Sequence, residues 1–232
     1  MKKAMWTISM LSLILTALVL QFMPSSMPAH YNAAGKIDRW GSKYENLIFP
    51  VLILALSLFW HLFITYYERK ASRSTDEKES AEARSNATVM KVVGVSTAAM
   101  HTVMHGFLLY SSYMEAITDA THSAIDIGKV SCILCGTLFI VLGNFIPKSK
   151  KNLAAGIRIS WSMYNDITWM KSNRFGAVAM MIAGVLTIVT AMFAKASIAF
   201  IMMIVYLLAA TTIILIYAYR IYKRELAKDS QS

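Results

Sequence analysis

The stretch GNFIPKSKKNLAAGIRISWSMYNDITWMKSNRFG, residues 143–176, lies between two apolar runs that are each long enough to cross a bilayer. It holds six Lys and Arg residues against a single acid, Asp166, and Trp161 and Trp169 are interleaved with these cations. Basic side chains beside membrane spans mark the cytoplasmic face, and Trp prefers the membrane interface. The stretch therefore predicts a basic, aromatic segment at the inner surface of a membrane.

The composition of the whole chain also favours a membrane protein. Hydrophobic residues make up 56% of the sequence and charged residues 16%, and the apolar residues cluster in long blocks. Six blocks approach the roughly 20 residues that a spanning helix needs. They are residues 5–23, 46–66, 92–112, 127–146, 175–194 and 197–219. We therefore expect an all-α fold, a polytopic integral membrane protein with six transmembrane helices.

The distribution of charge predicts the orientation. If the N-terminus is inside, the inner segments hold eighteen of the 23 Lys and Arg residues. The outer segments then hold only Lys36, Arg39, Lys43, Lys129 and Lys195. By the positive-inside rule, both termini are cytoplasmic. The net charge of +10 then reflects topology and attraction to membrane lipid, and we expect no direct contact with nucleic acid because no DNA-binding module is recognisable.

The spans divide the chain into four parts. We expect an N-terminal two-span unit at 1–66 with an outer loop at 24–45, and a charged cytoplasmic linker at 67–91 that is either a helical extension or a solvated loop. A four-span unit at 92–219 with a cytoplasmic loop at 147–174 follows, and then a cytoplasmic tail at 220–232. The first run could be a signal peptide, but its exit, PSSMP, lacks an A-x-A cleavage pattern, so we interpret it as a retained span.

Residues of the 143–176 stretch also match a known motif over more than 30 positions. They are Asn144, Pro147, Lys148, Lys150, Asn152, Gly156, Ile157, Arg158, Trp161, Trp169, Arg174 and Gly176. This set resembles the C-terminal motif of the SdpI family, bacterial membrane proteins that confer immunity to a secreted peptide toxin. The chain departs from the usual motif at residues 159–160, 165–166 and 172–173.

The outer loop carries a second resemblance. Its residues Pro28, His30, Asn32, Gly35, Asp38, Gly41, Ser42 and Lys43 are similar to a domain of unknown function found at the N-terminus of many SdpI-type proteins. Three interpretations of this loop stay open. Asp38 and Asn32 fold it through hydrogen bonds between side chain and backbone, the loop contacts the toxin or gates the response to it, or Asp38, His30 and Lys43 perform acid–base chemistry.

The resemblance implies a function and assigns the two sets of residues to it. By resemblance, the protein protects a bacterial cell against a secreted peptide toxin, and it also signals by capturing a small winged-helix repressor at the membrane. The outer loop would then meet the toxin, and the inner segment would dock the repressor, with a short interfacial helix expected over residues 162–173. The alternative for the inner segment is simple anchoring in lipid by its Trp and Arg side chains.

Two further pairs of residues each have a structural and a functional interpretation. His101 and His105 share a helix face, which is consistent with interhelical packing, a proton relay or a metal site that would need further ligands. Cys132 and Cys135 lie inside an apolar run, where small packing residues are a better interpretation than a redox motif. No phosphate loop or hydrolase motif is present, so we expect no enzyme and no cofactor. A small-solute transporter or channel-like protein is the alternative function.

Overall fold

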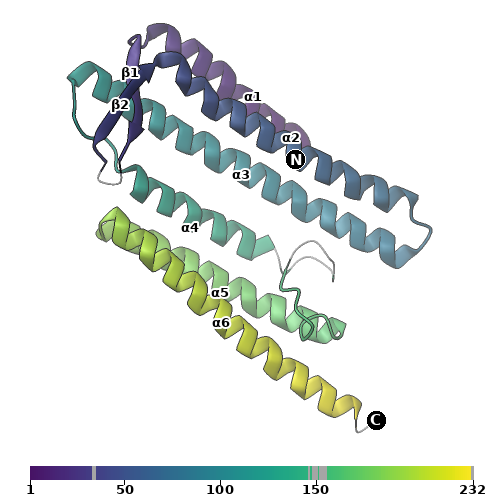
Figure 1. Cartoon of the computed structure of the whole chain (residues 1–232). Coiled ribbons are helices and arrows are strands. Elements are labelled where there is room, and N and C mark those ends of the chain that lie inside the picture. Colours follow the sequence, from purple (N-terminus) through teal and green to yellow (C-terminus); the bar gives the residue numbers. More distant parts are fainter. Residues whose placement is uncertain (33–34, 146, 148–150, 152–155, 231–232) are drawn as a thin grey trace.

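The computed structural model describes residues 1–32, 35–145, 147, 151 and 156–230. Six long helices and one β-hairpin dominate this part of the chain (Figure 1). The helices are α1 (Lys2–Val19), α2 (Ile48–Arg73), α3 (Glu77–Thr118), α4 (Ile127–Phe145), α5 (Asp166–Phe193) and α6 (Ala196–Asp229). The strands are β1 (Ser26–Tyr31) and β2 (Ile37–Ser42), and short 3₁₀ helices η1 (Leu20–Phe22) and η2 (Lys43–Leu47) flank them.

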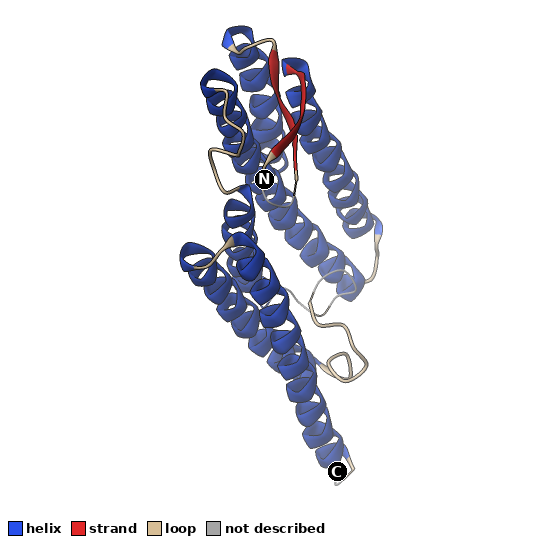
Figure 2. Ribbon diagram, turned by 60° about the vertical axis from the view of Figure 1, so that its left-hand side comes forward, coloured by secondary structure: helices blue, strands red, loops and turns tan. Residues whose placement is uncertain are grey.

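The helices form two groups of three. α1, α2 and α3 pack on one another, α4, α5 and α6 do the same, and α3 contacts α4 between the groups. Successive helices alternate in direction (Figures 1 and 2). The β-hairpin, the segment 119–126 and the turn at Lys195 therefore lie at one end, here called the hairpin end. The start of α1, the end of α6 and the segment 156–165 lie at the opposite end, here called the terminal end.

All six helices are long and apolar enough to cross a membrane, which confirms the predicted six-helix fold. Their ends differ from the apolar runs because polar residues extend several of them. α3 has 42 residues and continues beyond both ends of the predicted span 92–112. The charged linker is mostly helical, since α2 continues to Arg73 and α3 begins at Glu77, where the Asp76 side chain accepts a hydrogen bond from the Lys78 amide at 2.9 Å.

Glycines set the distance between α4 and α5. A Cβ added at Gly136 would lie 2.7 Å from the Gly184 carbonyl oxygen, and one added at Gly184 would lie 2.5 Å from the Gly136 oxygen. The two backbones therefore approach each other directly, as small residues allow in membrane helix pairs. Cys132, one turn before Gly136, is buried beside Ala191 of α5 and Ala199 of α6, in agreement with the interpretation of this cysteine as a packing residue.

Residues 162–173 do not form the separate interfacial helix that the sequence predicts. Residues 160–163 make a turn, and α5 runs without a break from Asp166 through Phe193. A capping box starts it, in which the Asn165 side chain accepts from the Thr168 amide at 2.8 Å and Thr168 Oγ1 accepts from the Asn165 amide at 3.0 Å. Residues 166–173 of the expected interfacial helix therefore form the first two turns of α5, whereas residues 162–165 precede this helix.

Candidate functional site

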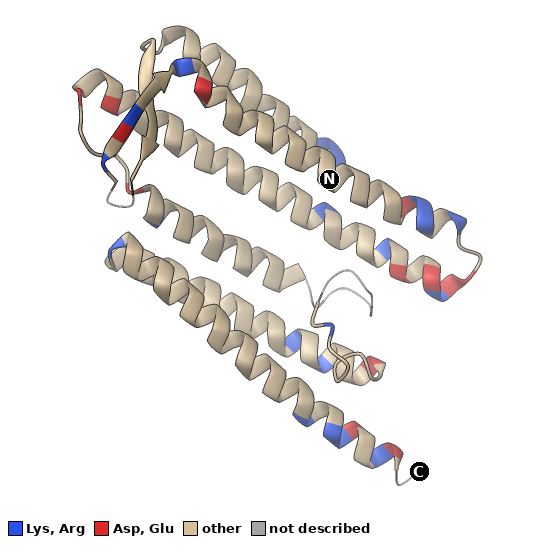
Figure 3. Ribbon diagram, viewed as in Figure 1, with Lys and Arg blue, Asp and Glu red and all other residues tan. Residues whose placement is uncertain are grey.

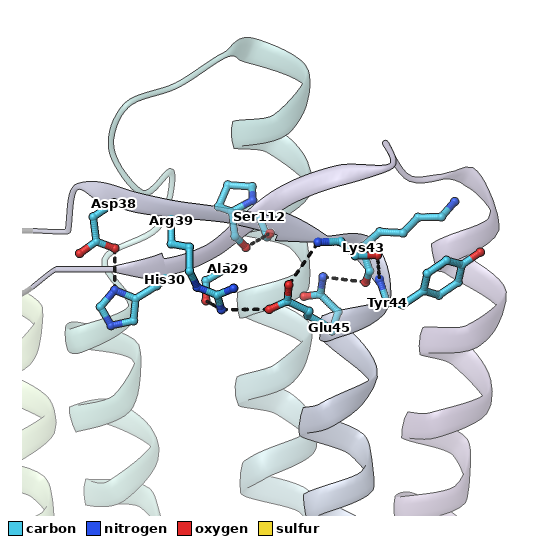
Figure 4. A network of polar contacts seen from close by, with 11 residues as sticks. Ala29, His30, Asp38, Arg39, Lys43, Tyr44, Glu45 and Ser112 are labelled. Atoms are coloured by element: carbon cyan, nitrogen blue, oxygen red, sulfur yellow. Dashed lines mark hydrogen bonds and ion pairs between the residues drawn. The ribbon is translucent and has the colours of Figure 1, made fainter.

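The hairpin end presents a two-stranded antiparallel sheet across the tops of the first three helices (Figures 1 and 4). Its register pairs Ser26 with Ser42 and Tyr31 with Ile37, with irregularities around His30. The hairpin is fixed to α3 where the Ser112 hydroxyl donates to the Pro28 carbonyl at 3.1 Å. The sequence predicts an outer loop over residues 24–45, whereas the structure folds most of the described part of it into two strands. Hydrogen bonds to α3 and to the segment 119–126 hold these strands in place.

Asn32 and Gly35 build the tip of the hairpin. The Asn32 amide donates to the Lys36 carbonyl at 2.9 Å, and the Asn32 side-chain oxygen accepts from the Lys36 amide at 3.1 Å. Gly35 has φ of +73°, a left-handed conformation that side chains with a Cβ rarely adopt. Asn32 therefore has the turn-forming role that the structural interpretation gave it.

The segment 119–126 holds the tip from the side. The Ile37 amide donates to the Thr121 carbonyl at 3.0 Å, and the Ser123 amide donates to the Gly35 carbonyl at 2.9 Å. Lys36 and His122 form an isolated antiparallel bridge. The hairpin is therefore backed on its β2 side by a connection that lies more than 80 residues later in the chain.

The second half of the outer motif secures the start of α2. Arg39 donates to Glu45 Oε2 at 2.9 Å, and the Glu45 carboxylate also accepts from the Ser42 amide at 3.2 Å (Figure 4). A Cβ at Gly41 would overlap this carboxylate, so the close approach requires glycine. Lys43 Nζ donates to the Met23 carbonyl at 3.2 Å, which ties η2 to the end of the first helix.

His30 and Asp38 differ from the rest of the outer motif because their side chains point away from the hydrogen bonds that hold the hairpin to α2. His30 Nδ1 lies 2.5 Å from Asp38 Oδ1, and both side chains are exposed (Figure 4). Exposed ion pairs contribute little stability, about 0–1 kcal/mol. Asp38 pairs with His30 and not with the backbone of the turn, and of the two non-catalytic interpretations its exposed position favours surface contact.

A buried carboxylate that the sequence analysis missed lies behind the hairpin. Glu115 of α3 is fully enclosed and accepts three hydrogen bonds, from Tyr31 Oη at 2.7 Å, Ser111 Oγ at 2.5 Å and the Ala124 amide at 2.7 Å. Burial, and then the hydrogen bond to Glu115, raises the pKa of the Tyr31 phenol above its usual range. Tyr31 therefore stays a donor at physiological pH, and Glu115 joins β1, α3 and the segment 119–126.

Tyr31 also lines a recess of about 260 Å³ between the hairpin and the ends of α2 and α3. Its lining includes Arg39 and Glu45 from the hairpin side, Phe49 from α2, and His105 and Ser112 from α3. The recess is thus lined by charged groups on the exposed side and by an aromatic pair further in. This combination is typical of small binding sites.

A seam of polar side chains leads from this recess into the first three helices. His105 Nε2 lies 2.9 Å from Thr16 Oγ1 of α1, so His105 makes the interhelical contact that the packing interpretation expects. His101 instead contacts the Thr97 carbonyl of its own helix at 2.7 Å. Further along α1, Ser9 Oγ lies 2.6 Å from Ser57 Oγ of α2. Within the described chain, no group of three or more His, Cys, Asp or Glu side chains could hold a metal.

At the terminal end, the inner motif folds onto the first turns of α5. The Asn173 side-chain oxygen accepts from the Ile157 amide at 2.8 Å. Gly156 has φ of +104°, and a Cβ there would overlap Asn173 and press on Trp169. A Cβ at Gly176 would overlap Ile157. The two glycines therefore let the segment lie directly against α5, so they support its shape.

Trp169 and Trp161 have different positions. Trp169 is 4% exposed and packs beside Gly156, so it belongs to the core of this end. The Trp161 ring lies 4.9 Å from that of Tyr219 on α6. Arg158 and Arg174 are exposed, and so is Asn144 at the end of α4, whereas Lys148, Lys150 and Asn152 lie outside the described residues.

A cleft of about 790 Å³ lies next to this segment, between the starts of α3 and α5. Acidic side chains from both helices line it, among them Asp76, Glu82 and Asp166, together with Pro147 and Trp169. Two residues of the inner motif, Pro147 and Trp169, thus border the cleft. The exposed arginines of the motif do not line it.

The fold and these two ends define a multi-pass α-helical membrane protein with a structured hairpin at one end and a folded, basic segment at the other. Comparison with protein families is consistent with this class. The model of the SdpI/YfhL protein family matches residues 148–218, and the model of a domain of unknown function, DUF1648, matches residues 7–54. These matches confirm the SdpI family resemblance and the N-terminal domain that accompanies it. No curated protein and no solved structure matches the chain.

Proposed function

We propose that this chain protects a bacterial cell against a secreted, membrane-active peptide toxin. The SdpI/YfhL match carries the proposal, since at the level of the family it supports a membrane protein of the immunity type. We place the protein in the cell membrane with the hairpin end outside and both termini in the cytoplasm. The proposed partners are membrane lipid and the toxin, and the proposed role includes neither catalysis nor direct contact with nucleic acid.

The distribution of charge supports this orientation. The Lys and Arg residues of the described chain gather mostly at the terminal end, and fewer lie at the hairpin end (Figure 3). In a background without Cys132 and Cys135, the exposed positions Ser26 and Thr118 changed to cysteine should react with an impermeant thiol reagent in intact cells. Ser72→Cys, exposed at the terminal end, should react only after lysis. The opposite pattern would reverse the orientation.

Protection is tested by deleting the gene and challenging the cells with candidate peptide toxins. Deletion should sensitise cells to at least one toxin, and the wild-type gene should restore resistance. Asp38→Ala and His30→Ala probe the exposed face of the hairpin, and Thr118→Ala at the same end is the matched control. Gly35→Val is unsuitable because φ of +73° makes it disrupt the turn. Unchanged sensitivity of the deletion strain to every tested peptide would oppose the proposal.

Signalling by capture of a small winged-helix repressor is the second part of the proposal. The acidic cleft of about 790 Å³ beside the inner motif supports a docking role for the terminal end. Arg158 is exposed and carries a planar fork of donors that lysine lacks. A docking role predicts that Arg158→Lys loses signalling as Arg158→Ala does. If Arg158→Lys signals normally while Arg158→Ala does not signal, simple attraction of the arginine to lipid would be favoured.

A transporter or channel for a small solute is the alternative. The polar seam supports it, since Ser9, Ser57, Thr16 and His105 pair across the first three helices, and Ser12 Oγ is enclosed without a hydrogen-bond partner among the described residues. The neighbouring genes discriminate between the immunity function and the transport function. An adjacent repressor or toxin gene favours immunity, whereas a solute-catabolism operon favours transport.

A further inference from the structure

The recess beside the hairpin is large enough for one ring but not for a whole peptide. Its volume of about 260 Å³ lies just under the range of roughly 300–1,000 Å³ that is usual for sites of drug-sized ligands. Arg39 and Glu45 stand on its open side, since their side chains are 55% and 35% exposed. His105, 4% exposed, stands on its closed side.

The hydrogen bonds of His105 determine which ring nitrogen carries the proton. The Thr16 hydroxyl donates to the Ser12 carbonyl at 2.7 Å, so Thr16 Oγ1 is available to His105 only as an acceptor. Nε2 of His105, 2.9 Å away, must therefore be the donor, and Nδ1 of the neutral ring is an acceptor. No described residue makes a hydrogen bond to this Nδ1. The nearby His101 differs, because the carbonyl of Thr97 occupies its Nδ1.

The wall next to His105 is flat and aromatic. The Phe49 ring stacks on the His105 ring, with centroids 5.3 Å apart and planes 8° from parallel. Both residues line the recess. Aromatic rings pack well on such surfaces, whereas an aliphatic occupant would separate the Nδ1 acceptor from water without replacing its hydrogen bond, which is unfavourable.

We propose that the recess binds one flat aromatic side chain that carries a hydrogen-bond donor, an indole or phenol ring, with the donor on Nδ1 of His105. This inference rests on the proposed function, because it assigns the ring to the peptide toxin that meets the hairpin end. A lipid acyl chain is the competing occupant. An acyl chain would fill the apolar part of the recess and make no hydrogen bond with Nδ1.

The test compares two ring compounds of nearly equal shape. Indole has an N–H donor, and indene has a CH₂ group in its place. Their binding to the purified full-length protein in detergent is measured by equilibrium dialysis. We expect saturable binding of indole and about tenfold weaker binding of indene, in line with the usual effect of leaving a buried acceptor unpaired. His105→Phe should abolish the preference, and His101→Phe, the matched control, should retain it.

Three results would overturn the proposal. Equal binding of indole and indene by the wild type would indicate a recess that does not select for a hydrogen-bond donor. This comparison uses only the wild-type protein, so it does not depend on whether any variant folds. Absence of saturable indole binding would indicate that the recess is not a site. A preference that persists in His105→Phe would assign the acceptor to another residue. His105→Gln keeps an acceptor and should retain part of the preference.

A protection assay separates this inference from the proposed function. If indole is preferred and His105→Phe also sensitises cells, the ring belongs to the toxin. If indole is preferred but His105→Phe cells resist fully, the assignment of the ring to the toxin is wrong. If indole is not preferred while gene deletion still sensitises cells, the recess proposal fails and the immunity proposal survives.

Discussion

Replacing Glu115 by alanine should detach the hairpin from the helices beneath it. The carboxylate accepts from Tyr31 Oη at 2.7 Å, from Ser111 Oγ at 2.5 Å and from the Ala124 amide at 2.7 Å. Hydrogen bonds to charged groups are worth about 1.5–3 kcal/mol each. Tyr31 and Ala124 keep some exposure and can bind water instead, whereas Ser111 is 1% exposed. We therefore expect the loss to be about 3 kcal/mol, well below the sum of three full bonds.

Hydrogen exchange of the backbone amides in β1 and β2 measures this loss directly, because local opening controls their exchange. Since about 1.4 kcal/mol corresponds to a factor of ten, hairpin amides in Glu115→Ala should exchange about 100-fold faster than in the wild type. Amides of α5 and α6 should keep their rates, since neither helix contacts the hairpin extensively. Glu115→Gln retains one oxygen acceptor and should show a smaller change.

The control for this experiment is Thr118→Ala. Thr118 lies one turn further along α3, is exposed, and donates only to the Met114 carbonyl of its own helix at 2.7 Å. It should leave hairpin exchange unchanged. If Glu115→Ala behaves like Thr118→Ala, the carboxylate does not hold the hairpin, and the Ser112 contact with Pro28 becomes the main connection.

Three further predictions concern stability. Gly184→Val should push α4 away from α5, because the valine Cβ would overlap the Gly136 carbonyl. The expected cost of about 1–3 kcal/mol should lower the apparent melting temperature. An unchanged melting temperature would contradict this packing. Asn173→Leu removes the acceptor of the Ile157 amide and should make the segment 156–165 more sensitive to limited proteolysis, unlike an exposed change such as Asp38→Asn. Asp38→Asn itself should change stability by less than about 1 kcal/mol, and a larger loss in thermal unfolding would show that the exposed pair with His30 supports the fold.

The six spans could be predicted from the sequence because length and apolar character are sufficient to identify them. The ends of the helices could not be predicted in this way. Glu115 lies in a stretch, residues 113–126, that contains acids and no Lys or Arg, a composition typical of an outer loop. The structure places it in α3, where it is buried and accepts a hydrogen bond from Tyr31, 84 positions earlier. Such a partner is visible only after the hairpin has been placed on the helix.

Trp169 shows the same limit at the terminal end. A tryptophan among cations beside a span predicts an interfacial anchor, yet this side chain is buried against Gly156. The conformation of Gly156 and the bond from Ile157 to Asn173 fold the segment over it. Local composition indicates where a residue lies relative to the membrane, but tertiary contacts determine whether its side chain faces lipid or protein.

Among the residues that the structure describes, the two motifs therefore mark mostly residues that shape the protein. In the outer motif, Asn32, Gly35 and Gly41 form the turn and the close approaches, and they leave His30 and Asp38 as its exposed pair. Changes at the shaping residues alter the surface indirectly, so loss of protection in such variants does not identify a contact. Contact is better sought at the exposed pair and in the recess, where a variant can remove an interaction and leave the hairpin intact.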